Sequence, residues 1–202
     1  MFVTFEGCEG VGKSTQVKLL REYLERTGQN AVYIREPGST KISEQIRDVI
    51  ANPQNTEMTD ITEAMLFAAS RAQLVREVIR PALERGELVI CDRYIDSSVA
   101  YQGYARGMGV DVIKKINEPA IDGLLPDLTI FLDLRPSEAW RTFKNTDRME
   151  QESADFHDRV YEGYIAEIKG SNGRIVPVKP DFDKKVTAEH ILEVMRQRGA
   201  IK

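Results

Sequence analysis

The chain contains little cysteine: only Cys8 and Cys91 occur in 202 residues. Two cysteines are too few for a disulfide scaffold and lack the paired spacing of a structural zinc site, so we expect reduced thiols. No apolar run approaches the roughly 20 residues that cross a bilayer, and the N-terminus lacks the basic stretch and apolar core of a secretory signal. We therefore expect a cytoplasmic protein with no membrane partner.

An excess of either charge is also missing, since 28 lysines and arginines stand against 32 acidic residues, for a net charge of -4. Such a balance produces no broad field that attracts nucleic acid, so we expect no nucleic-acid partner. Any polyanion must be held at a local site. The length fits one domain, and no repeat or linker divides the chain, so we predict a single domain over residues 1–202.

Short β-rich apolar runs alternate with longer segments of helical period. Strands are predicted at residues 2–5, 31–35, 88–91, 128–133 and 174–178. Helical stripes that could pack on a sheet are formed by Val17, Leu20 and Leu24, by Ile42, Ile46, Val49 and Ile50, and by Phe156, Val160, Tyr164 and Ile168. This alternation predicts an α/β fold, with a five-stranded parallel sheet flanked by helices on both faces.

The most specific motif follows the first predicted strand and fits G-x-x-x-x-G-K-[ST]: Gly7, Cys8, Glu9, Gly10, Val11, Gly12, Lys13 and Ser14, with Thr15 next. Glycines let the backbone curl so that N–H groups point at phosphate oxygens, and a helix start adds its positive dipole end. Lys13 is expected to reach the β- and γ-phosphates, and Ser14 to ligate Mg²⁺. The alternative, a glycine-rich turn without a ligand, does not explain this lysine and hydroxyl.

A second anchor follows the third predicted strand, where the chain continues with Asp92 and Arg93. Ligands gather at the carboxyl ends of strands in open α/β sheets, so both side chains should emerge beside the phosphate loop. Asp92 is a candidate for Mg²⁺ or its water shell, and the alternative is a salt bridge or helix cap. Arg71, inside an apolar helix, and Arg148 are further candidates for binding a second phosphate. The guanine-reading Asn-Lys-x-Asp run of switch GTPases is absent.

These residues together resemble the bacterial thymidylate kinase family. The resemblance rests, in family order, on residues 5–15, 35–38, 66–71, 92–94, 97–98, 100–103, 132–133 and 147–150. It implies a P-loop nucleoside monophosphate kinase that transfers the γ-phosphoryl of ATP to dTMP, with Mg²⁺. It also implies a homodimer. The alternatives are a kinase for another nucleoside monophosphate and a nucleotide-binding regulator without turnover.

For the base, the resemblance implies that Phe67 stacks on thymine, where an aromatic face contributes about 1–3 kcal/mol. Arg71 and Gln102 would hydrogen-bond the base edge, assisted by Ser98. Glu36 and Pro37 would line the pocket, with Pro37 near the thymine methyl. The alternatives are Phe67 in the core, Gln102 on a helix surface and Ser98 as a helix start.

For the sugar and phosphate, the resemblance implies that Tyr101 crowds the 2′ position and so favours deoxyribose. Arg93 would hold the acceptor phosphate, and Glu9 would lie near the 3′-hydroxyl or the metal waters. The alternative for Tyr101 is again a helix surface. Because the acceptor phosphate is already an anion, no general base is required, and Lys13 and Arg93 should act by alignment and charge.

A mobile lid is expected at residues 140–151. Some family members place a basic residue in the phosphate loop, but this chain has Gly10 there, so the lid must supply the charge. We predict Arg148 as the catalytic arginine, with Arg141 or Lys144 secondary. The alternative for Arg148 is a structural salt bridge at the hinge.

Two further expectations concern side chains near these motifs. A thiol at a helix N-terminus tends toward a lower pKa, so Cys8 could be reactive, and the alternative is that both cysteines are inert core residues. His157 and His190 are predicted to lie far from every motif and are given no role.

Overall fold

The computed structural model describes residues 1–139 and 147–202. Its centre is a parallel sheet of β1 (Phe2–Glu6), β2 (Ala31–Arg35), β3 (Leu88–Asp92), β4 (Leu128–Leu132) and β5 (Ile175–Val178). The strand order is β2-β3-β1-β4-β5, and every pair is parallel. The predicted fold class is confirmed, and the predicted strand ends differ from the observed ones by at most one residue.

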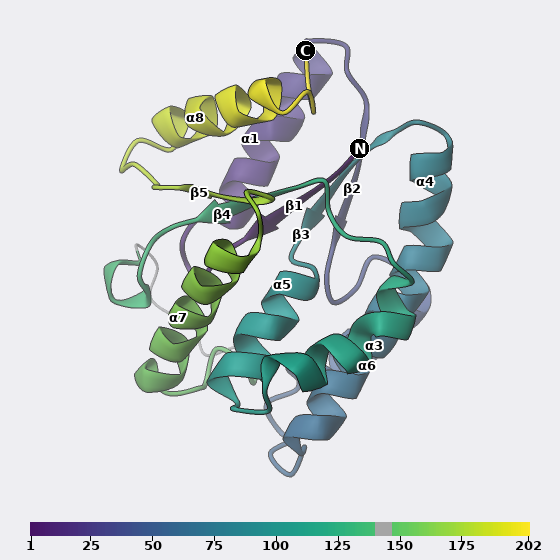
Figure 1. Cartoon of the computed structure of the whole chain (residues 1–202), viewed down its shortest axis with the longest axis vertical. Helices are drawn as coiled ribbons and strands as arrows, with labels where there is room; N and C mark the ends of the chain where they lie inside the picture. The colour runs from purple at the N-terminus through teal and green to yellow at the C-terminus, as the bar shows by residue number, and fades with distance from the viewer. Residues whose placement is uncertain (140–146) are drawn as a thin grey trace.

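The described chain has eight α-helices around the sheet (Figure 1): α1 (Lys13–Arg26), α2 (Lys41–Ala51), α3 (Asp60–Leu74), α4 (Arg80–Glu84), α5 (Ile95–Ser98), α6 (Val110–Ile121), α7 (Ala154–Gly170) and α8 (Lys184–Gln197). A π-helical segment, Val75–Ile79, joins α3 to α4, and another, Val99–Ala105, continues α5. Helices α1 and α8 lie together on one side of the sheet, and α3 to α7 lie on the other (Figure 1). None of the helices described is both long and apolar enough to cross a membrane.

The register of the sheet fixes where the functional motifs meet. Phe5 on β1 and Arg35 on β2 both pair with Asp92 on β3. All residues of β1 and β4 are buried, as expected for central strands covered on both faces. The same carboxyl end of the sheet therefore carries the phosphate loop after β1, Glu36 after β2 and Arg93 after β3.

The expectation that the α2 stripe packs on the sheet is wrong. Ile50 is buried, but Ile42 and Val49 remain nearly half-exposed. Helix α2 packs on α3 instead. An apolar stripe at helical spacing shows that a helix has a preferred face, but it does not identify the surface that covers this face.

Helix α7 approaches the segment Val99–Ala105 so closely that a side chain at Gly163 has no room. A Cβ atom there would lie 2.9 Å from Cβ of Tyr104 and 3.0 Å from Cα of Ala100. This approach lets Tyr101 pack edge-on against Phe156 and Tyr164 of α7, with ring centroids 6.2 and 6.5 Å apart. The contact thus connects α7 to the end of the sheet where the motifs meet.

We expect Gly163→Ala to destabilise the protein, although alanine is the better helix former by about 1 kcal/mol. Overpacking a tight helix contact costs about 1–3 kcal/mol, which outweighs that gain. Gly170→Ala is the matched control, since a Cβ at this last residue of α7 meets nothing within 4 Å. Thermal unfolding should show a lower Tm for Gly163→Ala alone, and a Tm equal to that of the parent would contradict the close approach.

Candidate active site

The phosphate loop, residues 7–12, lies between β1 and α1. Gly10 and Gly12 have φ angles of 75° and 99°, a left-handed conformation that is costly for a residue with a Cβ atom. Helix α1 begins directly afterwards at Lys13, and the N–H groups of its first turn have no carbonyl partner within the helix. Together with the helix dipole, these groups make the loop suitable for binding phosphate.

The Lys13 ammonium is folded over this loop. Its Nζ donates hydrogen bonds to the carbonyl oxygens of Gly7 at 2.8 Å and Cys8 at 2.7 Å, and the residue is buried. Burial lowers the pKa of Lys13 and nearby Arg93 lowers it further, whereas Glu9 and Asp92 act in the opposite direction. The predicted phosphate-binding lysine therefore lies inside the loop.

Ser14 and Asp92 lie next to each other at the start of α1 and the end of β3. The Ser14 Oγ donates to Oδ2 of Asp92 at 3.3 Å. The other oxygen of Asp92, Oδ1, is buried and has no hydrogen-bond partner within the described ranges. Hydroxyl and carboxylate oxygens are ligands that Mg²⁺ prefers, usually together with substrate phosphates. Among the residues described, no group of three or more acidic, histidine or cysteine side chains could hold a metal alone.

The Arg93 guanidinium occupies the centre of the site. Its Nη1 donates to Ser97 Oγ at 3.1 Å and to Tyr164 Oη at 3.3 Å. Its Nη2 donates to Glu9 Oε1 at 2.5 Å and to Tyr101 Oη at 3.1 Å. Its backbone φ is 71°, a left-handed angle that is uncommon for a residue other than glycine. Such strained residues cluster at functional sites, which agrees with the predicted importance of Arg93.

Glu9 stays ionised beside Arg93. Burial by itself raises the pKa of Glu9, but the charges of Arg93 and Lys13 and a hydrogen bond from Tyr101 bring it down to about 2. The phosphate loop and the end of β3 are thus joined by an ion pair between Glu9 and Arg93.

A fully buried carboxylate, Glu6, supports this arrangement from the end of β1. It accepts hydrogen bonds from the backbone N–H of Tyr94 at 2.7 Å, from Ser97 Oγ at 2.6 Å and from Tyr164 Oη at 2.7 Å. Sequence reasoning assigned no role to Glu6 or Tyr164. The available signal for Glu6 was a charged residue directly after the predicted strand 2–5, whereas Tyr164 looked like any other residue of a helical stripe.

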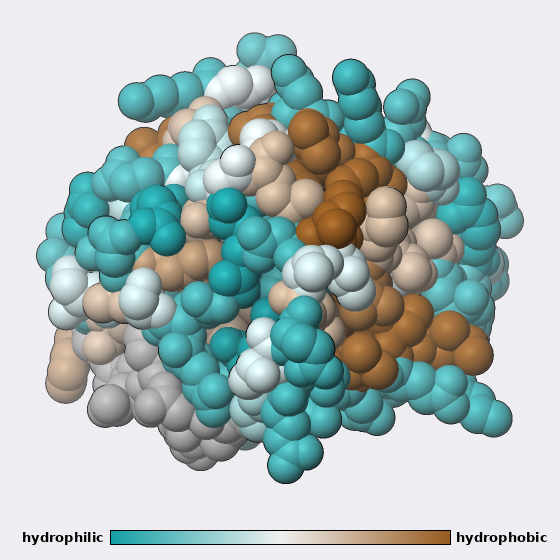
Figure 2. Space-filling view, turned by 90° about the horizontal axis from the view of Figure 1, so that it is seen from below, coloured by the Kyte–Doolittle hydropathy of each residue, from teal (hydrophilic) through white to brown (hydrophobic). Residues whose placement is uncertain are grey.

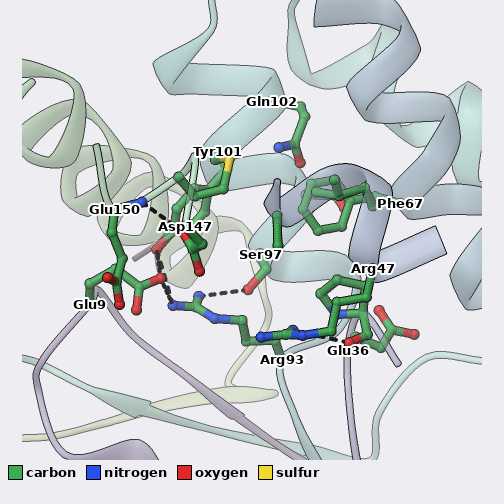
Figure 3. Close-up of a pocket in the computed structure, with 15 residues that line it drawn as sticks. Glu9, Glu36, Arg47, Phe67, Arg93, Ser97, Tyr101, Gln102, Asp147 and Glu150 are labelled. Carbon is green, nitrogen blue, oxygen red and sulfur yellow. Dashed lines mark hydrogen bonds and ion pairs between the residues drawn. The ribbon is translucent and has the colours of Figure 1, made fainter. Parts of the chain in front are cut away.

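A cavity of about 210 Å³ lies beside Arg93 (Figure 3). It is lined by Glu9, Glu36, Pro37, Arg47, Ile50, Ala51, Phe67, Arg93, Ser97, Ser98, Tyr101, Gln102, Asp147, Met149 and Glu150. Eight of the nine predicted substrate-binding residues line it, and the ninth is Arg71. The structure therefore brings together predicted side chains from six of the motif ranges that carry the resemblance.

Arg71 lies behind the cavity wall instead of on it. It is 1% exposed, and its Nε donates to Glu36 Oε2 at 2.8 Å. Its other donors go to the Asn117 side chain, the carbonyl of Tyr94 and the hydroxyl of Ser98. In this arrangement Arg71 acts on the cavity through Glu36 and Ser98, and its direct contact with a base stays a prediction.

The pKa of Glu36 is shifted in the opposite direction from that of Glu9, although each carboxylate is paired with an arginine. Burial raises the pKa of Glu36 to about 7, and the nearby Arg71 only partly opposes this. Its Oε1 is buried and finds no hydrogen-bond partner in the described parts of the chain.

Arg47 is a cavity residue that sequence reasoning missed. It comes from α2, lines the cavity and donates through Nη1 to the carbonyl of Pro37 at 3.1 Å. Burial lowers the pKa of Arg47, and Arg35 adds to this effect. Its position between Ile46 and Ile50 gave no sequence signal beyond ordinary helix amphipathicity.

A second hollow, of about 480 Å³, adjoins the other side of the phosphate loop. It is lined by Gly10, Gly12, Thr15, Gln16 and residues 182–184, which precede and begin α8. The Gln16 amide also donates to the carbonyl of Lys184 at 3.0 Å. No motif marked this C-terminal segment, so its place beside the loop was not foreseen.

The predicted lid lies only partly within the described chain, because Arg141 and Lys144 fall outside it. Arg148 is described, and its Nη2 contacts Glu63 Oε2 at 2.5 Å while its Nε donates to the carbonyl of Ile50 at 3.1 Å. These contacts match the alternative of a structural ion pair, and the catalytic role of Arg148 stays a prediction.

Two expectations about single side chains are wrong. Cys8 is 1% exposed, and burial raises the pKa of its thiol to about 12, which outweighs any effect of the helix end. It is therefore no reactive thiolate. His157 does not lie far from the motifs: its ring packs edge-on against Phe156, 5.6 Å between centroids, and Glu9 is close enough to raise its pKa against the larger effect of burial.

Comparisons with known proteins agree with this site. The family model described as thymidylate kinase matches residues 5–191. Thymidylate kinase of Thermoanaerobacter sp. (strain X514) is 45% identical to this chain over 198 residues, which cover 97% of each chain. Thymidylate kinase of Clostridium novyi (strain NT) is 49% identical over 179 residues, which cover 86% of this chain and 87% of the relative. The crystal structure of thymidylate kinase from Ehrlichia chaffeensis superimposes with a TM-score of 0.79 at 32% identity, covering 97% of this chain and 98% of that one. The chain belongs to the thymidylate kinase family.

Proposed function

We propose that the chain transfers the γ-phosphoryl group of ATP to dTMP, giving dTDP and ADP. The observation that carries this proposal is the position of Arg93. It stands between a phosphate loop and a cavity that has an aromatic ring, Phe67, and an amide, Gln102, on its walls. An acceptor phosphate on Arg93 would lie next to the triphosphate, with its base in the cavity.

On the donor side, the phosphates of ATP bind residues 7–15, and the hollow beside residues 182–184 takes the nucleoside part. Lys13 neutralises charge on the β- and γ-phosphates. Ser14 and Asp92 fit Mg²⁺ because the Ser14 hydroxyl lies beside one carboxylate oxygen of Asp92, and the other oxygen, Oδ1, is buried with no donor among the described residues. When bound, the metal ion neutralises the triphosphate.

On the acceptor side, Phe67 stacks on the base, Pro37 lies near its methyl group and Tyr101 limits the space at the 2′ position. Arg93 holds the acceptor phosphate. To do so, the guanidinium must share or release its ion pair with Glu9, whose carboxylate is then available to the 3′-hydroxyl. The acceptor phosphate is already anionic, so the residues act by alignment and charge stabilisation, without a general base.

The homodimer expected from the resemblance stays a prediction, and exposed apolar side chains support it. Ile42 and Val49 on α2 and Ile61 and Met65 on α3 are 43–56% exposed, and these two helices pack against each other. Figure 2 shows hydrophobic side chains gathered on one side of the molecule. The cytoplasm likewise stays the predicted compartment.

We expect dTMP to be preferred over dCMP, dGMP and AMP as the phosphoryl acceptor. The cavity is small and presents a stacking ring and an amide to one base. An ADP-release assay with ATP, Mg²⁺ and each nucleotide measures this preference through kcat/KM. Equal turnover of AMP and dTMP would show that the acceptor is assigned incorrectly.

Lys13→Ala should lower kcat by about 10²–10³, the usual effect of removing one group that stabilises transition-state charge. Lys18→Ala is the matched control, because Lys18 lies on the same helix with its side chain 77% exposed. Circular dichroism and Tm should stay close to the parent for both variants. Turnover of Lys13→Ala within a few-fold of the parent would refute the phosphate-loop assignment.

Arg148→Ala should lower kcat by about 10³ or more with little change in KM for dTMP, if Arg148 leaves Glu63 to screen the transferring group. Arg148→Lys should recover only part of this loss, because lysine lacks the planar fork. Measurements of kcat, KM and Tm are made together. A lower Tm with unchanged kcat would instead assign Arg148 to the ion pair with Glu63.

A further inference from the structure

Glu63 on α3 is a buried carboxylate that the mechanism above does not use. It is 1% exposed and connects three parts of the chain. Its Oε1 accepts from Gln102 Nε2 at 2.8 Å and from Arg106 Nε at 3.3 Å. Its Oε2 accepts from Arg106 Nη2 at 3.0 Å and contacts Arg148 Nη2 at 2.5 Å. Both oxygens are therefore satisfied.

Two arginines keep Glu63 ionised. Burial alone raises the pKa of Glu63, but hydrogen bonds and charges from Arg106, the hydrogen bond from Gln102 and the charge of Arg148 bring it below the ordinary value. An ionised carboxylate can only accept hydrogen bonds.

This restriction determines which way the Gln102 amide faces. The amide has one donor end and one acceptor end, and only the NH₂ end can pair with Glu63. A flip would place the amide oxygen against Oε1 of Glu63, leaving two buried acceptors in contact. The amide oxygen of Gln102 consequently points toward the space beside Phe67 and Ser97 (Figure 3).

We propose that Glu63 is a positioning residue that fixes the Gln102 amide with its oxygen toward the base, and thereby selects a pyrimidine whose N3 carries a hydrogen. Thymine has such an N3–H donor, whereas N3 of cytosine is an acceptor and would face the amide oxygen. The inference rests on the proposed function, since it concerns how the same cavity discriminates between acceptors.

Glu63→Gln provides a sharp test because it should reverse the Gln102 amide. The new amide oxygen is the better partner for the two Nη2 groups of Arg106 and Arg148, so it should take the place of Oε2. The new NH₂ group then takes the place of Oε1, where it gives up the longer contact with Arg106 Nε and faces Gln102. Two NH₂ groups repel, so Gln102 turns its oxygen toward residue 63 and its NH₂ group toward the base.

The experiment measures kcat/KM for dTMP and for dCMP, together with the binding of each nucleotide by calorimetry. In Glu63→Gln we expect the ratio of dTMP to dCMP to fall about 10- to 100-fold, as expected when a buried donor or acceptor loses its partner. The ratio cancels effects of Arg148 on the chemical step, because that step is common to both acceptors.

Glu152→Gln is the matched control. Glu152 also pairs with Arg106, at 2.5 Å, but no hydrogen bond joins it to Gln102 in the described structure. The same loss of one negative charge should leave the ratio unchanged. A second control is Gln102→Ala, in which the further change Glu63→Gln should no longer alter the ratio.

The outcomes separate the two proposals. A parent protein that accepts dCMP as well as dTMP contradicts the proposed function itself. A selective parent and an equally selective, folded Glu63→Gln variant overturn the inference and leave the function standing. Should Glu63→Gln not fold, Glu63→Asp keeps the charge for both arginines but withdraws the carboxylate from Gln102. It should then lower the ratio to a smaller extent, and an unchanged ratio again overturns the inference.

Discussion

The side chains at the carboxyl end of the sheet are arranged around the guanidinium of Arg93, which is largely shielded from water. A charge in such a place is costly unless it is paired and fully hydrogen-bonded. Glu9 neutralises it directly, and the hydroxyls of Ser97 and Tyr164, which donate to Glu6, accept hydrogen bonds from Arg93. Removing any one member would leave another buried polar group without its partner.

This network also explains why distant parts of the chain must come together. Glu6 and Glu9 flank the first glycine of the phosphate loop, Arg93 follows β3, and Tyr164 comes from α7. The parallel register of β1 and β3 aligns the first three, and the absence of a side chain at Gly163 lets α7 come close enough for Tyr164. Backbone geometry and buried electrostatics therefore favour the same arrangement, as expected when the local preferences of a sequence agree with its overall fold.

Much of the fold and the site could be predicted from local patterns. The strands were found because central parallel strands are short apolar runs, and the phosphate loop because its glycines and lysine must occur at fixed spacing. Contacts between side chains from different elements carry no such local signal. Arg47, Tyr164 and Glu63 looked like ordinary helix residues, and Cys8 was misjudged because burial, which raises its pKa, is a property of the folded chain.

The two carboxylates at opposite ends of the cavity differ in a way that matches a nucleotide. Burial raises the pKa of Glu36 to about 7, because Arg71 is its single cationic partner and Oε1 has no donor among the described residues. At Glu9 the same effect of burial is overcome by Arg93 and Lys13, so the pKa is about 2. The Glu9 end therefore remains ionic at neutral pH, and under the proposed function the acceptor phosphate would compete with Glu9 for Arg93. At the Glu36 end the carboxyl is only partly ionised near neutral pH, so under the proposed function an uncharged base meets a weaker negative charge there and its selection depends on the direction of hydrogen bonds.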